Sequence, residues 1–386
     1  MLRTRWPVLA AFVIVTSSNQ MLWLTFAPLT TKAAAHYDVG EGAIGGLSAV
    51  FPLLYVVLAI PFGIALDRRM RGSVLTGAVL TAAGALLRCV GDDFAWVLIG
   101  QLVVAIAQPL VTSSVAKVAA HYSTHEDEPT AIAVCSAGLF AGMLLAFGTG
   151  AAIGDDFRLL LAVQAGWAVV GAVLLTMGMR APGRTEDVPL VSSGKEAVKA
   201  VWADQVLRST ILLVTVGFGV FVGLTTWLQA LLEPDGIDET GAGVLLLVMV
   251  VAGVIGSVVI PPVAARRRAE SQVLLAALVV TAVGCAAMAV VHQIVVLGLL
   301  LAVMGLLLLS TLPVILEVIE RRAGSASGTA AALLWMAGNA GGLVVTGVLA
   351  PLLDFPAAAF VVLAVVALLG LPILRRLAPE ALSTSA

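Results

Sequence analysis

Long apolar runs separated by short polar segments limit most strongly what this chain can fold into. Of its 386 residues 60% are hydrophobic and 11% are charged, whereas about 25% of the residues in a soluble domain are charged. A helix that rises 1.5 Å per residue needs about 20 apolar residues to cross a hydrocarbon core of about 30 Å. The runs have about this length, so the sequence predicts an all-α membrane protein and not a soluble domain.

Twelve apolar runs are predicted to span the membrane, and the longest polar interval divides them into six and six. This division predicts an N-terminal six-helix bundle over 1–179, a cytoplasmic linker over 180–205 and a C-terminal six-helix bundle over 206–386. Within the linker, residues 194–203 have the pattern of an amphipathic surface helix. The predicted spans are 7–29, 43–66, 72–91, 94–120, 128–152, 157–179, 207–232, 240–263, 271–291, 293–317, 326–352 and 356–374.

The basic residues predict the orientation of these spans. If both termini are cytoplasmic, the outer side carries only three of the 21 Lys and Arg residues, namely Lys32, Arg88 and Arg158. Such an asymmetry follows the positive-inside rule and predicts a multi-pass protein of the cell (inner) membrane with both termini in the cytoplasm. The net charge of −2 and the lack of a Lys/Arg-rich arm give no reason to expect a nucleic-acid partner, and we expect none.

Residues for catalysis or metal binding do not cluster in the sequence. The three cysteines stand singly in apolar runs, and the four histidines fall in loops or at the ends of spans. No nucleophile, base and metal-ligand constellation is present in the spans. We therefore expect no metal, no cofactor and no enzymatic activity, and a monomer whose partners are a small-molecule substrate and the lipid bilayer.

The first span carries an unusual polar stretch, TSSNQMLWLTF, at residues 16–26. Unpaired polar groups are costly in hydrocarbon, so these side chains should face the protein interior or a water-filled cavity. Asn19 and Trp23 stand at i and i+4 and share a helix face, while Gln20 points about 100° away from Asn19. This stretch predicts a cavity lined by the first helix, with all three residues as candidate ligand contacts.

The loop after the second span, GIALDRRMRG, has the spacing G-x3-D-R-x2-R, formed by Gly63, Asp67, Arg68 and Arg71. At this spacing Asp67 is expected to cap the following helix and to hold an Arg of the same loop, clamping two helices at the cytoplasmic face. The loop resembles the signature of the major facilitator superfamily. The segment PPVAARRRAE, six spans later, keeps the basic cluster without the Asp-Arg pair, which fits the two repeated halves of that fold. Positive-inside anchoring alone is the alternative.

Four blocks narrow the resemblance: SSNQMLWLTFAPL, GGLSAVFPLLYVVLAIPFGIALDR, GQLVVAIAQPLV and LPVILEVIERRAGSASG. Together they look like the matching helices of the feline leukaemia virus subgroup C receptor-related transporters. That resemblance implies twelve transmembrane helices in a major facilitator fold of two six-helix bundles. It also implies transport of choline, ethanolamine or haem.

The resemblance carries over to particular residues of the chain. Trp23 and Gln108 match a Trp and a Gln that contribute to the family's central choline site. A Tyr and a Gln of that site are replaced here by Val222 and Trp335, so the ligand can differ while the cavity stays in place. Tyr55 matches a family tyrosine, for which gating and packing are both open.

Two further pairs are candidates for the site, each with helix packing as the alternative. Trp335 and Asn339 repeat the i, i+4 spacing of a Trp and an Asn in reversed order. Phe221 and Thr225 share one face of the seventh span.

The charges within the spans shape the expected ligand and mechanism. Only Glu317 among the acidic residues lies in a predicted span, near its cytoplasmic end, where a gating role competes with ion pairing to Arg321 or Arg322. A cation can be held on tryptophan faces without a counter-charge, whereas an anion would need a midspan Arg or Lys and haem an axial ligand. The sequence thus predicts alternating-access uniport of a small organic cation or neutral amphiphile, first a choline-like quaternary amine. Proton-coupled efflux of hydrophobic drugs or metabolites, haem transport, and a ligand sensor that moves nothing are the alternatives.

Overall fold

The computed structural model describes residues 4–154, 156–183, 194–237 and 239–377. These residues form helices and connecting segments, and no strand occurs among them. They divide into two compact units. Unit 1 comprises Met1–Val198 together with Gly324–Ala332, and unit 2 comprises Lys199–Ala323 together with Leu333–Ala386. This all-helical architecture confirms the predicted fold class.

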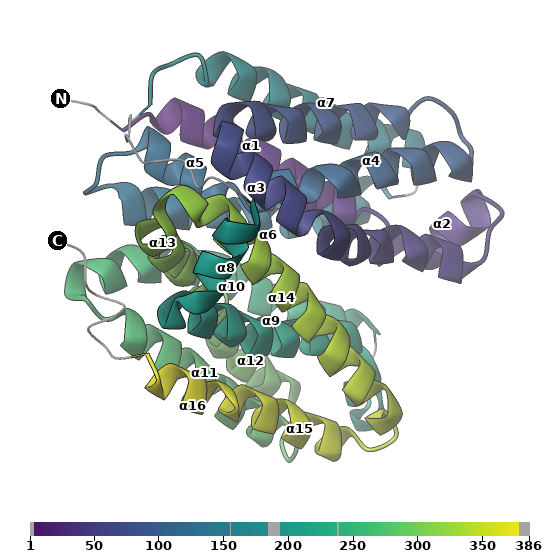
Figure 1. Ribbon diagram of the computed structural model, residues 1–386. Coiled ribbons are helices and arrows are strands. Elements are labelled where there is room, and N and C mark those ends of the chain that lie inside the picture. Colours follow the sequence, from purple (N-terminus) through teal and green to yellow (C-terminus); the bar gives the residue numbers. More distant parts are fainter. Residues whose placement is uncertain (1–3, 155, 184–193, 238, 378–386) are drawn as a thin grey trace. The chain divides into compact units, whose positions relative to one another are not determined.

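Unit 1 is built around α1, which packs against α4, α6 and α7. Figure 1 shows α3 and α4 running side by side in this unit, in agreement with their extensive contact. Its helices are α1 (Trp6–Trp23), η1 (Ala27–Leu29), α2 (Thr30–His36), α3 (Glu41–Leu87), α4 (Phe94–Thr112), α5 (Val115–Tyr122), α6 (Glu128–Ile153), α7 (Phe157–Gly178), the start of α8 (Gly194–Ala203), η3 (Gly324–Ala326) and the part of α14 (Ser327–Leu349) up to residue 332.

Unit 2 pairs α10 with α12 and α11 with α15. Its helices are α9 (Gln205–Leu232), η2 (Glu233–Asp235), α10 (Glu239–Arg267), α11 (Glu270–Met288), α12 (Ile294–Leu308), α13 (Thr311–Ala323), η4 (Ala350–Leu352), α15 (Pro356–Leu368) and α16 (Gly370–Arg375). The short η3 (Gly324–Ala326) and the first turns of α14 (Ser327–Leu349) belong to unit 1, and from Leu333 onward α14 belongs to unit 2.

Ten helical segments of the described residues are long and apolar enough to cross a membrane. Two of them, Ala43–Leu87 with 45 residues and Ile294–Leu352 with 59, each have the length of two crossings. The first bends at Arg69, whose backbone angles (φ −146°, ψ 62°) are not helical, and the second is interrupted between α12 and α13 and again at η3. Counting each of these long segments as two crossings reconciles the ten segments with the twelve predicted spans.

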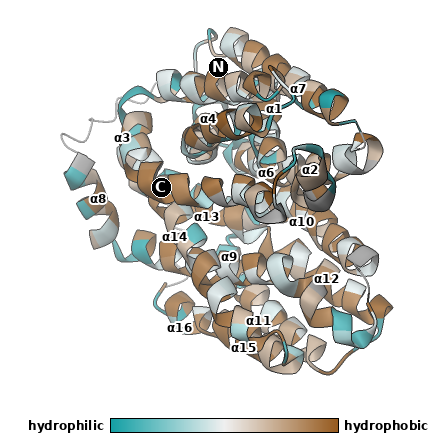
Figure 2. Cartoon of the chain, turned by 90° about the vertical axis from the view of Figure 1, so that its right-hand side faces the viewer, coloured by the Kyte–Doolittle hydropathy of each residue, from teal (hydrophilic) through white to brown (hydrophobic). Residues whose placement is uncertain are grey.

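The surface of the helices is apolar, as a lipid-facing surface must be. Large aliphatic side chains are widely exposed, among them Val290 at 73%, Leu53 at 66% and Val57 at 65%. Figure 2 shows hydrophobic residues along most of the length of the helices, with hydrophilic residues gathered mainly in the connecting segments and in α8. The chain is therefore a multi-pass membrane protein.

Both units contain a predicted span that is broken in its second half. In unit 1, α4 ends at Thr112 and α5 begins at Val115, and in unit 2, α12 ends at Leu308 and α13 begins at Thr311. The two breaks divide the fourth and the tenth predicted spans, which are equivalent if the halves are repeats. Interrupted helices at corresponding positions of two halves often mark a transporter's binding site.

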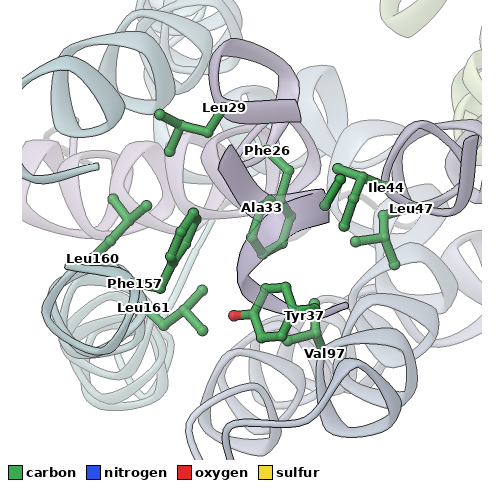
Figure 3. Packing of buried hydrophobic residues seen from close by; sticks show 11 residues of the cluster. Phe26, Leu29, Ala33, Tyr37, Ile44, Leu47, Val97, Phe157, Leu160 and Leu161 are labelled. Carbon is green, nitrogen blue, oxygen red and sulfur yellow. The ribbon is translucent and has the colours of Figure 1, made fainter. Parts of the chain in front are cut away.

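The segment between α1 and α3 folds back onto unit 1. Phe26, Ala33 and Tyr37 are buried there in one cluster with Leu47 of α3 and Phe157 of α7. Figure 3 shows the ring of Phe26 at the centre of this cluster, between Phe157 on one side and Ile44 with Leu47 on the other. We call it the α2 cluster, and it closes one end of unit 1.

The predicted amphipathic helix at 194–203 is confirmed by α8, which has the same bounds. Residues 184–193 of the predicted linker lie outside the described residues. The boundary between the units falls at residues 198 and 199, within the predicted linker, although residues 324–332 group with unit 1. That 1–179 and 206–386 act as two six-helix bundles stays a prediction.

Candidate functional site

Trp23 is the last residue of α1, and its side chain is partly exposed. The indole Nε1 donates a hydrogen bond to the carbonyl oxygen of Ser48 at 3.0 Å. The ring stacks on Phe51 with centroids 5.9 Å apart and planes inclined by 29°. Two contacts to α3 thus fix the orientation of the indole while part of it stays accessible.

Gln108 lies in the last turn of α4, beside the break that separates α4 from α5. Its backbone carbonyl accepts from the Thr112 hydroxyl at 3.0 Å, whereas its side-chain amide makes no hydrogen bond within the part of the chain that the structure describes. The residue is 6% exposed. An amide in this position can bind a hydroxyl group of a ligand.

Asn19 and Gln20 are buried inside unit 1. The Asn19 amide donates to the Thr81 hydroxyl and to the Val104 carbonyl, both at 3.3 Å, so it connects α1 to α3 and α4 and does not share the environment of Trp23. Gln20 packs against Gly142 of α6 and is 3% exposed. The geometry favours a packing role for both residues, and ligand contact stays a prediction.

Three aromatic rings of unit 2 lie together. Phe218 contacts Phe221 with centroids 5.9 Å apart, and it meets the Trp335 ring edge-on at 5.8 Å. Phe218 therefore joins two residues that the sequence singled out separately. We call Phe218, Phe221 and Trp335 the aromatic trio.

The polar candidates of unit 2 are bonded within their own helices. The Thr225 hydroxyl donates to the Phe221 and Val222 carbonyls, at 3.0 and 3.1 Å. The Asn339 amide donates to the Trp335 carbonyl at 2.8 Å. Val222, which stands where the family has a tyrosine, faces Gly342 of α14.

Tyr55 is fully buried and reaches the break between α4 and α5. Its hydroxyl is 2.7 Å from the Ser113 hydroxyl and accepts from the Thr112 hydroxyl at 3.0 Å. Tyr55 thus fastens α3 to the point where the fourth span is interrupted. This contact accounts for packing and leaves gating as a prediction.

Asp67 caps a distant helix. Its carboxylate accepts from the backbone N–H of Gly328 at 2.7 Å and from the N–H and hydroxyl of Thr329 at 2.9 and 2.6 Å. It also pairs with Lys117 of α5 at 2.7 Å. The expectation that Asp67 caps the following helix and holds an Arg of its own loop is therefore wrong: the capped helix is α14, and the cation is Lys117.

Gly63 allows this cap to form. A Cβ on Gly63 would lie 2.8 Å from the Ala332 Cβ and 2.9 Å from the Gly328 carbonyl oxygen, which only a glycine avoids. Arg68 and Arg71 are exposed. Of the four motif residues, two hold α3 against the start of α14, and two face outward.

Glu317 belongs to a buried acidic pair in unit 2. Arg321 lies 3.6 Å from a carboxylate oxygen of Glu317 and 3.6 Å from one of Glu270. Both glutamates are only 2% exposed. The predicted ion pairing of Glu317 with Arg321 is confirmed, and Glu270 joins it from α11.

The residues that sequence reasoning missed are chiefly charged or amide side chains near the ends of spans. Lys117 and Arg88 stand inside the predicted spans 94–120 and 72–91, and a basic residue inside a span is a signal for a buried partner. Arg88, which the sequence assigns to the outer side of the membrane, is fully buried. Gln101 donates its amide to three backbone carbonyls, those of Leu22, Trp23 and Leu47. The sequence contains no signal for the partner residue Thr329.

Histidines lie at the ends of helices, as expected. His36 is 2.9 Å from Asp92, and this hydrogen bond is the main cause that lowers the pKa of the Asp92 carboxyl. His292 lies 2.8 Å from Asp235. Among the described residues no group of three or more His, Cys, Asp and Glu side chains could hold a metal ion.

Comparison with known sequences places the chain among membrane transporters. The model of the Major Facilitator Superfamily matches residues 8–346. The protein named Solute carrier family 49 member A3 of Danio rerio is 30% identical over 260 residues, which cover 63% of this chain and 55% of the relative. The human protein named Choline/ethanolamine transporter FLVCR2 is 26% identical over 149 residues, which cover 38% of this chain and 28% of the relative.

These matches span little more than half of the curated relatives' length at most. Among solved structures, the major facilitator superfamily transporter FucP in the outward conformation superposes with a TM-score of 0.78 at 15% sequence identity. The superposition covers 95% of this chain and 97% of FucP, and it supports the fold alone. The family model, the twelve spans and this likeness agree, and the chain belongs to the major facilitator superfamily.

Proposed function

We propose that the chain is an alternating-access uniporter of a small organic cation, with a choline-like quaternary amine as substrate. The observation that carries the proposal is the partly exposed indole of Trp23 at the C-terminal end of α1, which Ser48 and Phe51 orient. A quaternary ammonium group binds to aromatic faces without a carboxylate, with about 2 kcal/mol or more per desolvated contact. The name of the human relative, a choline/ethanolamine transporter, supports the same substrate class.

The remaining contacts are assigned by chemistry. The Gln108 amide would bind the hydroxyl group that choline carries, because it has no hydrogen-bond partner of its own in the described chain. Taken by itself, unit 2 offers ring surface for a cation in the aromatic trio, with Thr225 and Asn339 as supports within the same two helices. Asn19 and Gln20 would act indirectly, by holding α1 in place.

The Asp67 cap would control access. Gly63 and Asp67 hold the start of α14, and from Leu333 that helix continues into unit 2. Breaking the cap leaves two N–H groups and Lys117 without their carboxylate, so the capped state is favoured by these contacts. We propose that transport requires the cap to open and close, that Tyr55 and Glu317 assist, and that Arg68 and Arg71 interact with the membrane surface.

Entry of a monovalent cation needs no proton, because the membrane potential contributes about 2.3 kcal/mol per 100 mV for each charge. The proposed location is the inner membrane with both termini cytoplasmic, and the proposed state is a monomer. Labelling of single cysteines placed near Arg5 and near Arg376 with an impermeant reagent tests the orientation. Labelling of either site in intact cells would contradict it.

One observation favours a second candidate, proton-coupled efflux of hydrophobic compounds. Glu270 and Glu317 are two buried carboxylates beside Arg321, and buried carboxylates are common in proton relays. Haem transport, the third alternative, would need an axial ligand, and His36 and His292 pair instead with acidic residues at helix ends.

Uptake of labelled choline into proteoliposomes separates these candidates. We expect uptake driven by an inside-negative potassium diffusion potential, unchanged when a pH gradient is added or collapsed, and inhibited by unlabelled quaternary amines but not by haem. Uptake that requires the pH gradient, and that is lost in Glu317→Gln, would support proton coupling. No uptake under either gradient would contradict the proposed substrate class.

A further inference from the structure

Arg88 is a fully buried cation that the proposed transport function does not use. It follows the last residue of α3, and its side chain has 0% exposure. Its Nη1 donates to the Leu22 carbonyl at 3.3 Å, and its guanidinium carbon lies 5.2 Å from the centroid of the Phe26 ring. These two contacts fix the plane and the direction of the guanidinium.

The opposite edge of the same guanidinium has donors without acceptors. Nε and Nη2 are both buried, and no oxygen among the described residues accepts a hydrogen bond from either. These two N–H groups lie on one edge of the guanidinium and point in parallel, which is the fork that binds carboxylates and other anions at two points. Nη1, whose hydrogen bond is satisfied, faces Leu22 of α1. The fork formed by Nε and Nη2 can bind another group.

No acidic residue of the described chain neutralises this charge. Asp92, four residues further on, is engaged by His36 at 2.9 Å and by Arg158 at 3.8 Å. The Leu22 carbonyl is shared with the Gln101 amide, which donates to it at 3.1 Å. A buried cation with only a shared neutral acceptor and an aromatic face is costly in a low-dielectric interior, and water would satisfy the fork's hydrogen bonds but not its charge.

The close packing around the guanidinium limits the size of any group that could bind to the fork. Gly84 of α3 and Gly100 of α4 approach so closely that a Cβ on either would collide with the other's carbonyl oxygen. Phe26, which covers one face of the guanidinium, is itself part of the α2 cluster (Figure 3). A group enclosed by close-packed backbone and aromatic rings accepts a small ion and excludes a bulky one.

We propose that the Nε and Nη2 edge of Arg88 is a buried binding site in unit 1 for a small monovalent anion, a halide or a carboxylate. The anion balances the guanidinium charge and ties the end of α3 to the end of α1 beneath the α2 cluster. Gln101 shares the Leu22 carbonyl with Arg88, and its Oε1, which accepts no hydrogen bond from the described residues, is an acceptor and so does not bind the anion.

Thermal unfolding of the full-length protein in detergent tests this site. At constant ionic strength, we expect chloride, bromide or formate to raise the Tm above its value in gluconate by about 2–3 °C at tenfold the Kd. The shift should vanish in Arg88→Gln, which keeps an amide donor for Leu22, and persist in Arg158→Gln, whose side chain is 82% exposed at a surface pair. A response to halides alone identifies a halide site, and a response to formate alone identifies a carboxylate site.

Two outcomes would overturn the proposal. One is a wild-type Tm that is the same in all four anions, and the other is an anion response in Arg88→Gln as large as in the wild type. If Arg88→Gln does not fold, anomalous scattering from wild-type crystals grown in bromide, and a structure obtained in formate, decide the matter. Density within hydrogen-bond distance of Nε and Nη2 supports the site, and a fork occupied only by water contradicts it.

Discussion

The two units share an architecture but use different polar chemistry to hold it together. In unit 1, side-chain hydrogen bonds cross from helix to helix, as when Asn19 of α1 donates to Thr81 of α3 and Gln101 of α4 donates to three carbonyls of α1 and α3. In unit 2, most hydroxyl groups return to carbonyls three or four residues earlier in the same helix, as those of Thr210, Thr215 and Thr225 do. Hydroxyl groups of unit 1, such as those of Thr16 and Ser18, also bond within their own helix, so unit 1 is distinguished by the interhelical bonds that Asn19 and Gln101 add.

The broken spans make the same contrast at equivalent places. At the break between α4 and α5 the Tyr55 hydroxyl from α3 meets the hydroxyls of Thr112 and Ser113. At the break between α12 and α13 the Ser310 hydroxyl donates to the Leu306 carbonyl of its own span. Gly256 of α10 packs closely against these two atoms, because it has no side chain. Helix packing in membranes uses both devices, small residues and interhelical polar contacts, and the two breaks differ in which of them they use.

The largest effect is expected from Asp67→Ala in unit 1. The variant leaves Lys117 and the N–H groups of Gly328 and Thr329 without their acceptor, in a pair whose side chains are 15% and 9% exposed. Removing one partner of a buried charge pair costs about 3–5 kcal/mol. We expect a large fall in the free energy of unfolding and loss of transport, measured by denaturant titration and by proteoliposome uptake.

Unit 2 has a matched control in Asp204, which caps α9 and pairs with Arg322 at 2.9 Å. Its pair is more exposed, with side-chain exposures of 28% and 37%, so Asp204→Ala should cost only about 1 kcal/mol. Equal losses in the two variants would show that burial of the Asp67 pair is not what matters.

A smaller effect is expected from Gln101→Leu compared with Thr225→Val. Gln101→Leu removes the donor from three buried carbonyls and should cost about 1–3 kcal/mol. Thr225→Val removes a hydroxyl whose acceptors are already bonded within the helix, so its cost should be below about 0.5 kcal/mol. Thermal unfolding of both variants checks the difference, and a Thr225→Val protein as unstable as Gln101→Leu would break the contrast between the units.

Glycine substitutions should show where the units are alike, with the smallest differences between them. A Cβ on Gly142 would collide with the Ser17 carbonyl, and one on Gly341 with the Thr215 carbonyl. Gly142→Ala and Gly341→Ala should each cost about 1–3 kcal/mol. Gly148→Ala and Gly347→Ala meet no atom within 4 Å and should be neutral or stabilising by up to about 1 kcal/mol, as unfolding temperatures will show.

Local features of the sequence predicted the spans and the amphipathic helix at 194–203, because both depend on composition and on the period of apolar residues. Local features could not predict the Asp67 cap, because the Asp67 carboxylate accepts from N–H groups that lie 261 and 262 residues away in the sequence. Spacing alone favoured the nearest helix start and the nearest arginine, and tertiary packing selected α14 and Lys117 instead.

Arg88 shows a second limit of sequence reasoning. It lies near the end of the predicted span 72–91, where basic side chains usually reach the membrane surface, so its place on the outer side in the charge count gave no indication of burial. The segment that carries Phe26 and Tyr37 folds back over that end of unit 1, so the guanidinium is enclosed. A short connecting helix such as α2 leaves too weak a periodic signal to predict this.

Isothermal titration of choline into the purified wild type, Trp23→Ala and Trp202→Ala tests the central claim most directly. Trp202 lies on α8 with 48% exposure and serves as a surface tryptophan control. Loss of a desolvated cation–π contact of about 2 kcal/mol predicts a Kd about thirtyfold weaker in Trp23→Ala, with the Trp202→Ala value equal to that of the wild type. An unchanged Kd in a folded Trp23→Ala protein would contradict the assignment of the site.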